Sequence, residues 1–169
     1  MGEVEKNALL FWSQKLVNDP EMLAEDPRGN KVGSNEFKLN QGESLKTFCN
    51  IGVQRICRGM DYQKLDGMVA NQMYKYMAKN WIVPTGTTVD KMHAAYTAAM
   101  IGDLCVLALK GNPHGHIAVV APQKPMLFSG KWNLYSPQVA NIGKTNGFMG
   151  ANYAFAEIPE VFILGNTVS

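Results

Sequence analysis

Residues 47–56 read TFCNIGVQRI and residues 115–120 read GHIAVV, and together these stretches decide the fold that the sequence predicts. In the first stretch, apolar positions recur at helical spacing from Cys49 through Val53 to Ile56, so a helix is predicted to begin beside Cys49, with Thr47 or Ser44 as its N-cap. In the second, His116 opens a short apolar run that is typical of a strand. We therefore expect a helix that carries Cys49 to pack on a strand that carries His116.

This arrangement favours nucleophilic chemistry. A thiol in the first turn of a helix is close to free backbone N–H groups and to the positive end of the helix dipole, and both favour the thiolate. A histidine that a strand holds against this helix can accept the thiol proton. We expect Cys49 to be the nucleophile and His116 its base. His114 and His93 are rival bases, but His114 follows Pro113 in a predicted turn and His93 falls within a predicted helix.

Structural roles compete with these functional ones. Cys49 shares an apolar helical face with its neighbours, and buried cysteines are common in protein cores. Cys57 and Cys105 lie inside a predicted helix and strand, so we expect them in the core. Three cysteines cannot all pair, and none has the spacing of a zinc or redox motif. The expectation is at least one free thiol, no metal and no cofactor.

A histidine base needs an orienting partner, and residues 139–143, VANIG, contain a candidate. Asn141 is polar in the middle of an apolar strand, and its amide oxygen could accept a hydrogen bond from the imidazole. Gln138 and Asn146 are alternatives, and Asn141 could instead be a bulge or turn residue.

The remaining pattern predicts an α+β fold, with N-terminal helices packed on a small, mainly antiparallel sheet in one domain, 1–169. Residues 123–136 are expected to be a long hairpin connection whose Trp132 and Tyr135 are exposed and could face a substrate. Residues 26–44 are rich in Gly, Asn and Ser and should be irregular. Thr88 is the predicted N-cap of a later helix that runs to about residue 100. Helices are predicted at residues 7–17, 47–60, 69–81 and 88–100, and strands at 104–109, 117–121, 138–142 and 161–164.

Composition narrows the function classes. The 169 residues are 46% hydrophobic and 18% charged, which is ordinary for a globular protein, and the net charge of +2 is unclustered and does not indicate nucleic acid. No apolar run is long enough for a transmembrane segment. The first residues are acidic rather than apolar, so no signal peptide is visible.

Four motifs in order, at residues 47–50 (TFCN), 102–106 (GDLCV), 115–120 (GHIAVV) and 139–143 (VANIG), resemble the CHAP and NlpC type of papain-like amidohydrolase. Members of that superfamily pair a cysteine at a helix N-terminus with a histidine on the sheet and a third polar residue on the next strand. The resemblance covers residues 44–143, and the papain-like core it implies extends to about residue 165. The tripeptide Phe48-Cys49-Asn50 differs from the Asp-Cys-Ser or Gln-Cys-Thr common in the family, which leaves the subfamily open.

The resemblance implies a cysteine peptidase or amidase that cleaves amide bonds of peptidoglycan at the bacterial cell wall, in the periplasm or outside the cell. Cys49, His116 and Asn141 would be its catalytic residues, acting through a thioester acyl-enzyme. The cleaved bond could lie within the stem peptide or between stem and sugar. Three kinds of protein fit this hypothesis: a phage lysin, an exported toxin with a proteinaceous inhibitor or immunity protein, and a secreted housekeeping wall enzyme.

Two other functions remain open from the sequence. The chain could be a non-catalytic wall-binding or adaptor module of the same fold, although the presence of all three polar residues favours an enzyme. It could also be a cysteine hydrolase that acts on a non-wall amide or thioester.

Overall fold

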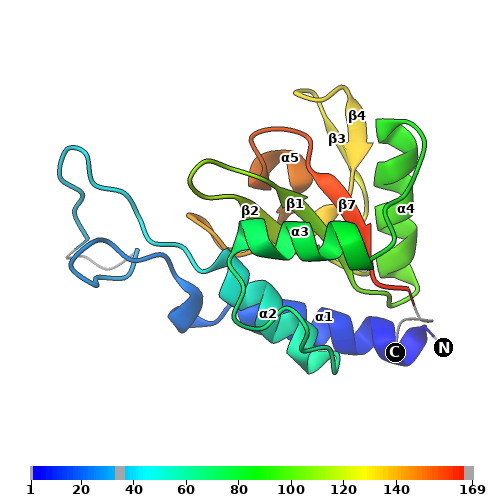
Figure 1. Cartoon of the computed structure of the whole chain (residues 1–169), viewed down its shortest axis with the longest axis horizontal. Coiled ribbons are helices and arrows are strands. Elements are labelled where there is room, and N and C mark those ends of the chain that lie inside the picture. Colours follow the sequence, from blue (N-terminus) through cyan, green and yellow to red (C-terminus); the bar gives the residue numbers. More distant parts are fainter. Residues whose placement is uncertain (1, 33–36, 166–169) are drawn as a thin grey trace.

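The computed structural model describes residues 2–32 and 37–165. Helices precede strands along the chain, which confirms the predicted α+β class (Figure 1). The elements are α1 (Glu3–Val17), the 3-10 helix η1 (Pro20–Met22), α2 (Cys49–Gly59), α3 (Ala70–Asn80), α4 (Thr88–Met100), β1 (Cys105–Leu109), β2 (His116–Val120), β3 (Leu127–Ser129), β4 (Leu134–Ser136), β5 (Gln138–Asn141), β6 (Gly147–Gly150), α5 (Ala151–Ala154) and β7 (Glu160–Ile163).

Five antiparallel strands form the main sheet in the order β6-β5-β2-β1-β7, and β3 pairs with β4 in a separate two-stranded sheet. Strand β2 is therefore central, with β1 on one side and β5 on the other. Helices α1, α2 and α3 cover one face of the sheet, and α4 and α5 cover the other (Figure 1). The strand that carries His116 is thus fixed by neighbours on both edges and both faces.

Two hydrophobic cores result, one on each face of the sheet. Ile117 and Val119 of β2 belong to the core beneath α1–α3, whereas Ala118 and Val120 belong to the core beneath α4 and α5. All four side chains are 0% exposed. A strand covered on both faces has no polar side to alternate with, which explains why the sequence of β2 is a continuous apolar run.

The four predicted helices and four predicted strands are present, with shifted ends. Helix α1 begins at Glu3 rather than at residue 7, because the Glu5 carboxylate accepts a hydrogen bond from the Gly2 N–H at 2.7 Å and so extends the helix by a turn. The N-cap of α4 is Thr87, not Thr88: the Thr87 hydroxyl accepts from the Asp90 N–H at 3.2 Å.

The prediction for the start of α2 was wrong in its detail. Its N-cap is Phe48, and no side chain caps the helix, so neither Thr47 nor Ser44 has the expected role. The aromatic Phe48 packs partly against the core beneath α1–α3. This contact, rather than a hydroxyl cap, accompanies the turn into the helix.

The sequence analysis did not predict five short elements: η1, β3, β4, β6 and α5. Residues 123–136 contain the β3–β4 hairpin, in which Tyr135 is 57% exposed as expected. Trp132 corrects the prediction, because it is half-buried and packs against the core beneath α4 and α5. The described residues of the stretch 26–44 lack helices and strands, as predicted, and residues 33–36 lie outside the description.

No helix in the described part of the chain combines the length and the hydropathy needed to cross a bilayer.

Candidate active site

Cys49 is the first residue of α2, and its side chain is buried, with 6% exposure. Burial raises the pKa of the thiol above its ordinary value, and this is the largest effect. The backbone N–H groups of Ile117, Asn50 and Cys49 itself act in the opposite direction and lower the pKa, because they stabilise the thiolate. The pKa of Cys49 is raised overall, so the resting side chain is a neutral thiol.

His116 is the first residue of β2 and lies 2.7 Å, from Nε2, to the side-chain oxygen Oδ1 of Asn141. Burial lowers the pKa of His116, and the hydrogen bond to Asn141 raises it by a smaller amount. The pKa is lowered overall, so the imidazole is neutral at pH 7. A neutral imidazole can accept a proton, which is the property that a general base requires.

Asn141 fixes which nitrogen of His116 carries the proton. Its side-chain Nδ2 donates to the Thr145 carbonyl oxygen at 2.7 Å, so the amide oxygen is directed towards the imidazole. Because an amide oxygen only accepts, Nε2 of His116 must donate, and Nδ1 is left unprotonated. Asn141 is 5% exposed, so this hydrogen bond is shielded from water.

Antiparallel pairing of β2 and β5 brings His116 and Asn141 together. Val119 pairs with Ala140 and Val120 with Val139, and continuing this register towards the start of β2 places Gly143 across from His116. A Cβ atom at Gly143 would lie 3.2 Å from Cε1 of the imidazole, so the glycine leaves room for the ring. The ring also contacts Phe155, with 4.9 Å between ring centroids.

Gly143 and Phe155 were missed by the sequence reasoning. The pairing register of β2 and β5 would have pointed to Gly143, because it places this residue across from His116. Phe155 follows the unpredicted helix α5, and no local signal in its sequence indicates a contact with His116.

Cys49 lies next to this site. The backbone N–H of Ile117, in the peptide unit that joins His116 to Ile117, stabilises the thiolate form of Cys49. Helix α2 packs directly on β2. No hydrogen bond joins the Cys49 sulfur to the imidazole within residues 2–32 and 37–165. The thiol and the base are therefore neighbours across one peptide, both uncharged, in the resting protein.

The rival candidates lie elsewhere. His93 and His114 are exposed, and neither accompanies Cys49 or Asn141. Gln138 donates to the Pro125 carbonyl oxygen at 3.1 Å, and Asn146 accepts from the Gly143 N–H at 2.9 Å. Among these candidates, Asn141 alone is hydrogen-bonded to His116.

A pocket of about 330 Å³ opens beside His116 and Asn141. Thr47, which the sequence suggested as a helix cap, contributes to its wall instead. The other lining residues are Gly143, Lys144, Thr145, Met149, Tyr153 and Ala154. His116 and Asn141 are therefore next to a cavity that could receive a substrate, whereas Cys49 is not among the residues that line it.

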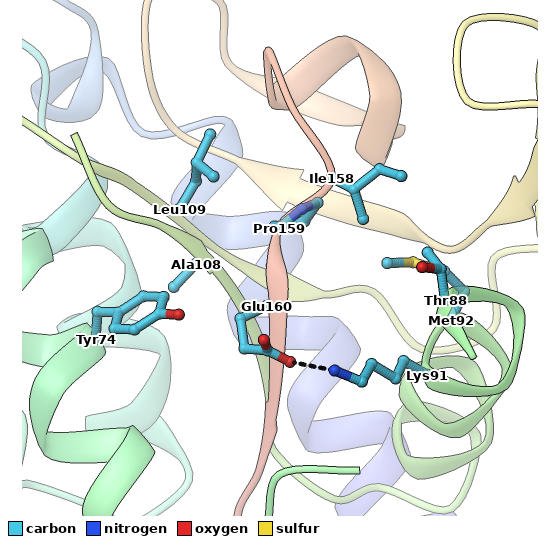
Figure 2. A pocket seen from close by; sticks show the side chains of 9 residues that line it. All are labelled: Tyr74, Thr88, Lys91, Met92, Ala108, Leu109, Ile158, Pro159 and Glu160. Carbon is cyan, nitrogen blue, oxygen red and sulfur yellow. Dashed lines mark hydrogen bonds and ion pairs between the residues drawn. The ribbon is translucent and has the colours of Figure 1, made fainter. Parts of the chain in front are cut away.

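A second pocket, of about 230 Å³, lies between α3, α4 and β7 (Figure 2). Lys91 Nζ and Glu160 Oε1 meet there at 3.2 Å, so its two charged side chains neutralise each other. No cysteine or histidine lines it. Within the described residues, no cluster of three His, Cys, Asp or Glu side chains is suited to hold a metal ion.

Comparison with models of known protein families finds no match to this chain, and comparison with curated proteins finds no significant match either.

Proposed function

We propose that this chain is a papain-like cysteine amidohydrolase that cleaves amide bonds of bacterial peptidoglycan, with Cys49, His116 and Asn141 as its catalytic residues. The observation that carries the proposal is the oriented hydrogen bond between His116 and Asn141, formed next to a cysteine at the start of a helix. A buried imidazole N–H needs an acceptor in any role, but an acceptor that also fixes the tautomer, beside a thiol at a helix start, is the arrangement that a general base uses.

The choice of peptidoglycan as the proposed substrate rests on the resemblance of the four ordered motifs. The four sequence motifs that resemble the CHAP and NlpC type fall on the start of α2, the turn before β1, the start of β2 and the end of β5. A helix that carries the cysteine and packs on an antiparallel sheet that carries the other two residues supports a papain-like arrangement. The proposed site of action is the bacterial cell wall.

In the proposed mechanism, the Cys49 sulfur attacks the carbonyl carbon of the amide while its proton passes to Nδ1 of His116. The imidazole then gives this proton to the leaving amine, the C–N bond breaks, and the acyl group remains on Cys49 as a thioester. Water attacks the thioester while His116 takes one of its protons, and the released thiolate recovers that proton. Asn141 holds the ring in one orientation throughout and favours the Nε2–H tautomer whenever the ring is neutral.

Negative charge develops on the carbonyl oxygen during both attacks. The N–H of Cys49, in the first turn of α2, where no side chain caps the helix, would stabilise it together with the helix dipole. One such donor is typically worth about 3 kcal/mol in the transition state.

The test is digestion of purified peptidoglycan by the wild-type protein and by Cys49→Ala, with the fragments identified by mass spectrometry. Cys57→Ala is the matched control, because Cys57 lies in the same helix and is fully buried away from the pocket. Cleavage should be lost in Cys49→Ala and retained in Cys57→Ala, and the fragment masses identify the bond.

Intact peptidoglycan with the wild-type protein would overturn the proposed substrate. Retention of the protein on sedimented wall sacculi would then favour a binding module. Release of label from acyl amides or thioesters, lost in Cys49→Ala, would favour a hydrolase of another substrate.

A further inference from the structure

Lys144 lies in the wall of the pocket beside His116 and Asn141, three positions after Asn141 in the chain. We propose that Lys144 binds a free carboxylate of the substrate close to the scissile amide, so that the site prefers anionic peptides to their amidated forms. This inference rests on the proposed amidohydrolase function and specifies the substrate class further.

The charge of the pocket supports an anionic ligand. All nine residues that line it are described, and Lys144 is the only one with a charged side chain, since the lowered pKa of His116 keeps that ring neutral. No acidic side chain lines the pocket to oppose a carboxylate. The hydroxyl groups of Thr47 and Thr145 add hydrogen-bond donors to the same wall.

Lys144 is also available for a ligand. It forms no ion pair or hydrogen bond with any residue in the described ranges 2–32 and 37–165. By contrast, the nearby Lys124 lies over the ring of Phe148, with its Nζ 4.6 Å from the ring centroid. A cation without a protein partner, at the wall of a pocket, is free to pair with a substrate group.

The backbone beneath Lys144 is held in place on both sides. The Gly143 N–H donates to the Asn146 side chain at 2.9 Å, and Asn146 in turn donates to the Met22 carbonyl oxygen at 2.8 Å. Thr145 accepts from Asn141. Hydrogen bonds therefore connect the turn that carries Lys144 to Asn141 and to η1. These bonds fix the position of the backbone from which the lysine side chain extends.

The experiment uses two peptides of identical sequence derived from the wall stem peptide, one with a free carboxylate next to the scissile amide and one with a carboxamide there. Their dissociation constants are measured by calorimetry with Cys49→Ala, which cannot turn them over, and their KM and kcat values with the active protein. Each measurement is repeated with Lys144→Met, Lys144→Arg and Lys124→Met.

We expect the carboxylate peptide to bind about five- to tenfold more tightly than the carboxamide peptide, as suits a charge-assisted hydrogen bond in a partly open site. Lys144→Met should abolish this preference through KM with kcat little changed. Lys144→Arg and the control Lys124→Met should retain it.

Equal binding of the two peptides, or a preference that survives Lys144→Met, would overturn the role of Lys144. The calorimetric measurement tests this preference without requiring the protein to cleave either peptide. Absence of cleavage of both peptides, with the carboxylate preference intact in the binding arm, would instead overturn the proposed hydrolysis.

Discussion

Asn141 has the most specific hydrogen-bond arrangement of any side chain in the site. It is buried at the end of a strand, donates to a backbone carbonyl oxygen and accepts from an imidazole, so both ends of its amide are used. An amide satisfied at both ends cannot rotate without losing two hydrogen bonds, each of which is costly to leave unmade when buried. The tautomer of His116 is therefore determined by a side chain that the surrounding backbone holds in one orientation.

Replacing Asn141 by alanine should lower kcat for wall cleavage by about 10²-fold or more, because His116 loses the acceptor that keeps Nδ1 unprotonated. Asn141→Asp, which keeps an acceptor oxygen, should retain more activity than Asn141→Ala. Gln138→Ala is the control and should leave kcat unchanged, since Gln138 bonds to Pro125 instead. Equal losses in Asn141→Asp and Asn141→Ala would contradict an orienting role.

The ionisation of Cys49 leads to a prediction about pH. Burial raises the pKa of this thiol, so its alkylation by iodoacetamide should rise with pH and reach half its maximum rate above the pH of an ordinary thiol. Cys57, whose pKa burial raises to about 12, and the fully buried Cys105 should react later. Peptide mapping after timed alkylation measures the order.

In the same assay, Cys49→Ala should remove the fast-reacting site and leave the slow ones unchanged. Rapid alkylation of Cys49 between pH 6 and 7 would contradict the prediction. It would indicate a thiolate paired with a protonated His116 in the resting protein.

At the scale of single residues, the sequence indicated candidate site residues where a polar side chain stands in an otherwise apolar segment. Asn141 in an apolar strand and His116 at the start of another are visible without a structure. Gly143 and Phe155 are not, because their importance comes from a contact across β5 and from a helix of four residues. The site residues themselves stay predictions until activity is measured.

Among the secondary-structure elements, α2 is the one that sets the position of the proposed nucleophile, Cys49. It approaches the end of the sheet at Gly52, where an added Cβ would overlap Cδ1 of Ile142, just beyond β5. The glycine therefore permits a short distance between the helix and the strand that carries Asn141.

Gly52→Ala should lower the free energy of unfolding by about 1–3 kcal/mol, because the methyl group must displace a buried isoleucine. Urea denaturation measures the loss. Gly130→Ala is the control, since its Cβ would meet nothing within 4 Å and should cost little. Combining Gly52→Ala with Ile142→Val should cost less than the two single losses together, and simple additivity would contradict the contact.

Element length explains which parts of the fold the sequence could predict. The helices of eleven or more residues and the apolar strands β1, β2, β5 and β7 repeat a pattern often enough to be recognised. The missed strand β6 has the sequence GFMG, too short and too rich in glycine to show alternation. It exists because it pairs with β5. Such elements depend on tertiary contacts more than on their own residues.

At the scale of the whole molecule, the two cores should make the centre of the sheet the most stable region. Amide hydrogen exchange should be slowest in β1 and β2, whose backbones are paired on both sides and whose faces are covered. It should be fastest in residues 37–44, which contribute no side chain to either core. Mass spectrometry of peptic fragments measures both.

Exchange in β2 as fast as in residues 37–44 would contradict a rigid support for His116. Cys49→Ala should give the same exchange pattern as the wild type, because the substitution removes only one sulfur atom from the core beneath α1–α3.

The strand order also has a consequence for when the protein becomes active during its synthesis. A ribosome releases α2 with Cys49 early, β2 with His116 later, and β5 with Asn141 later still, yet β5 must join β2 before the imidazole is oriented. A growing chain that ends before β5 has the proposed nucleophile and base but lacks the residue proposed to align them. If the proposed mechanism holds, competence comes late in translation, and a truncated product that stops before Asn141 should be inactive.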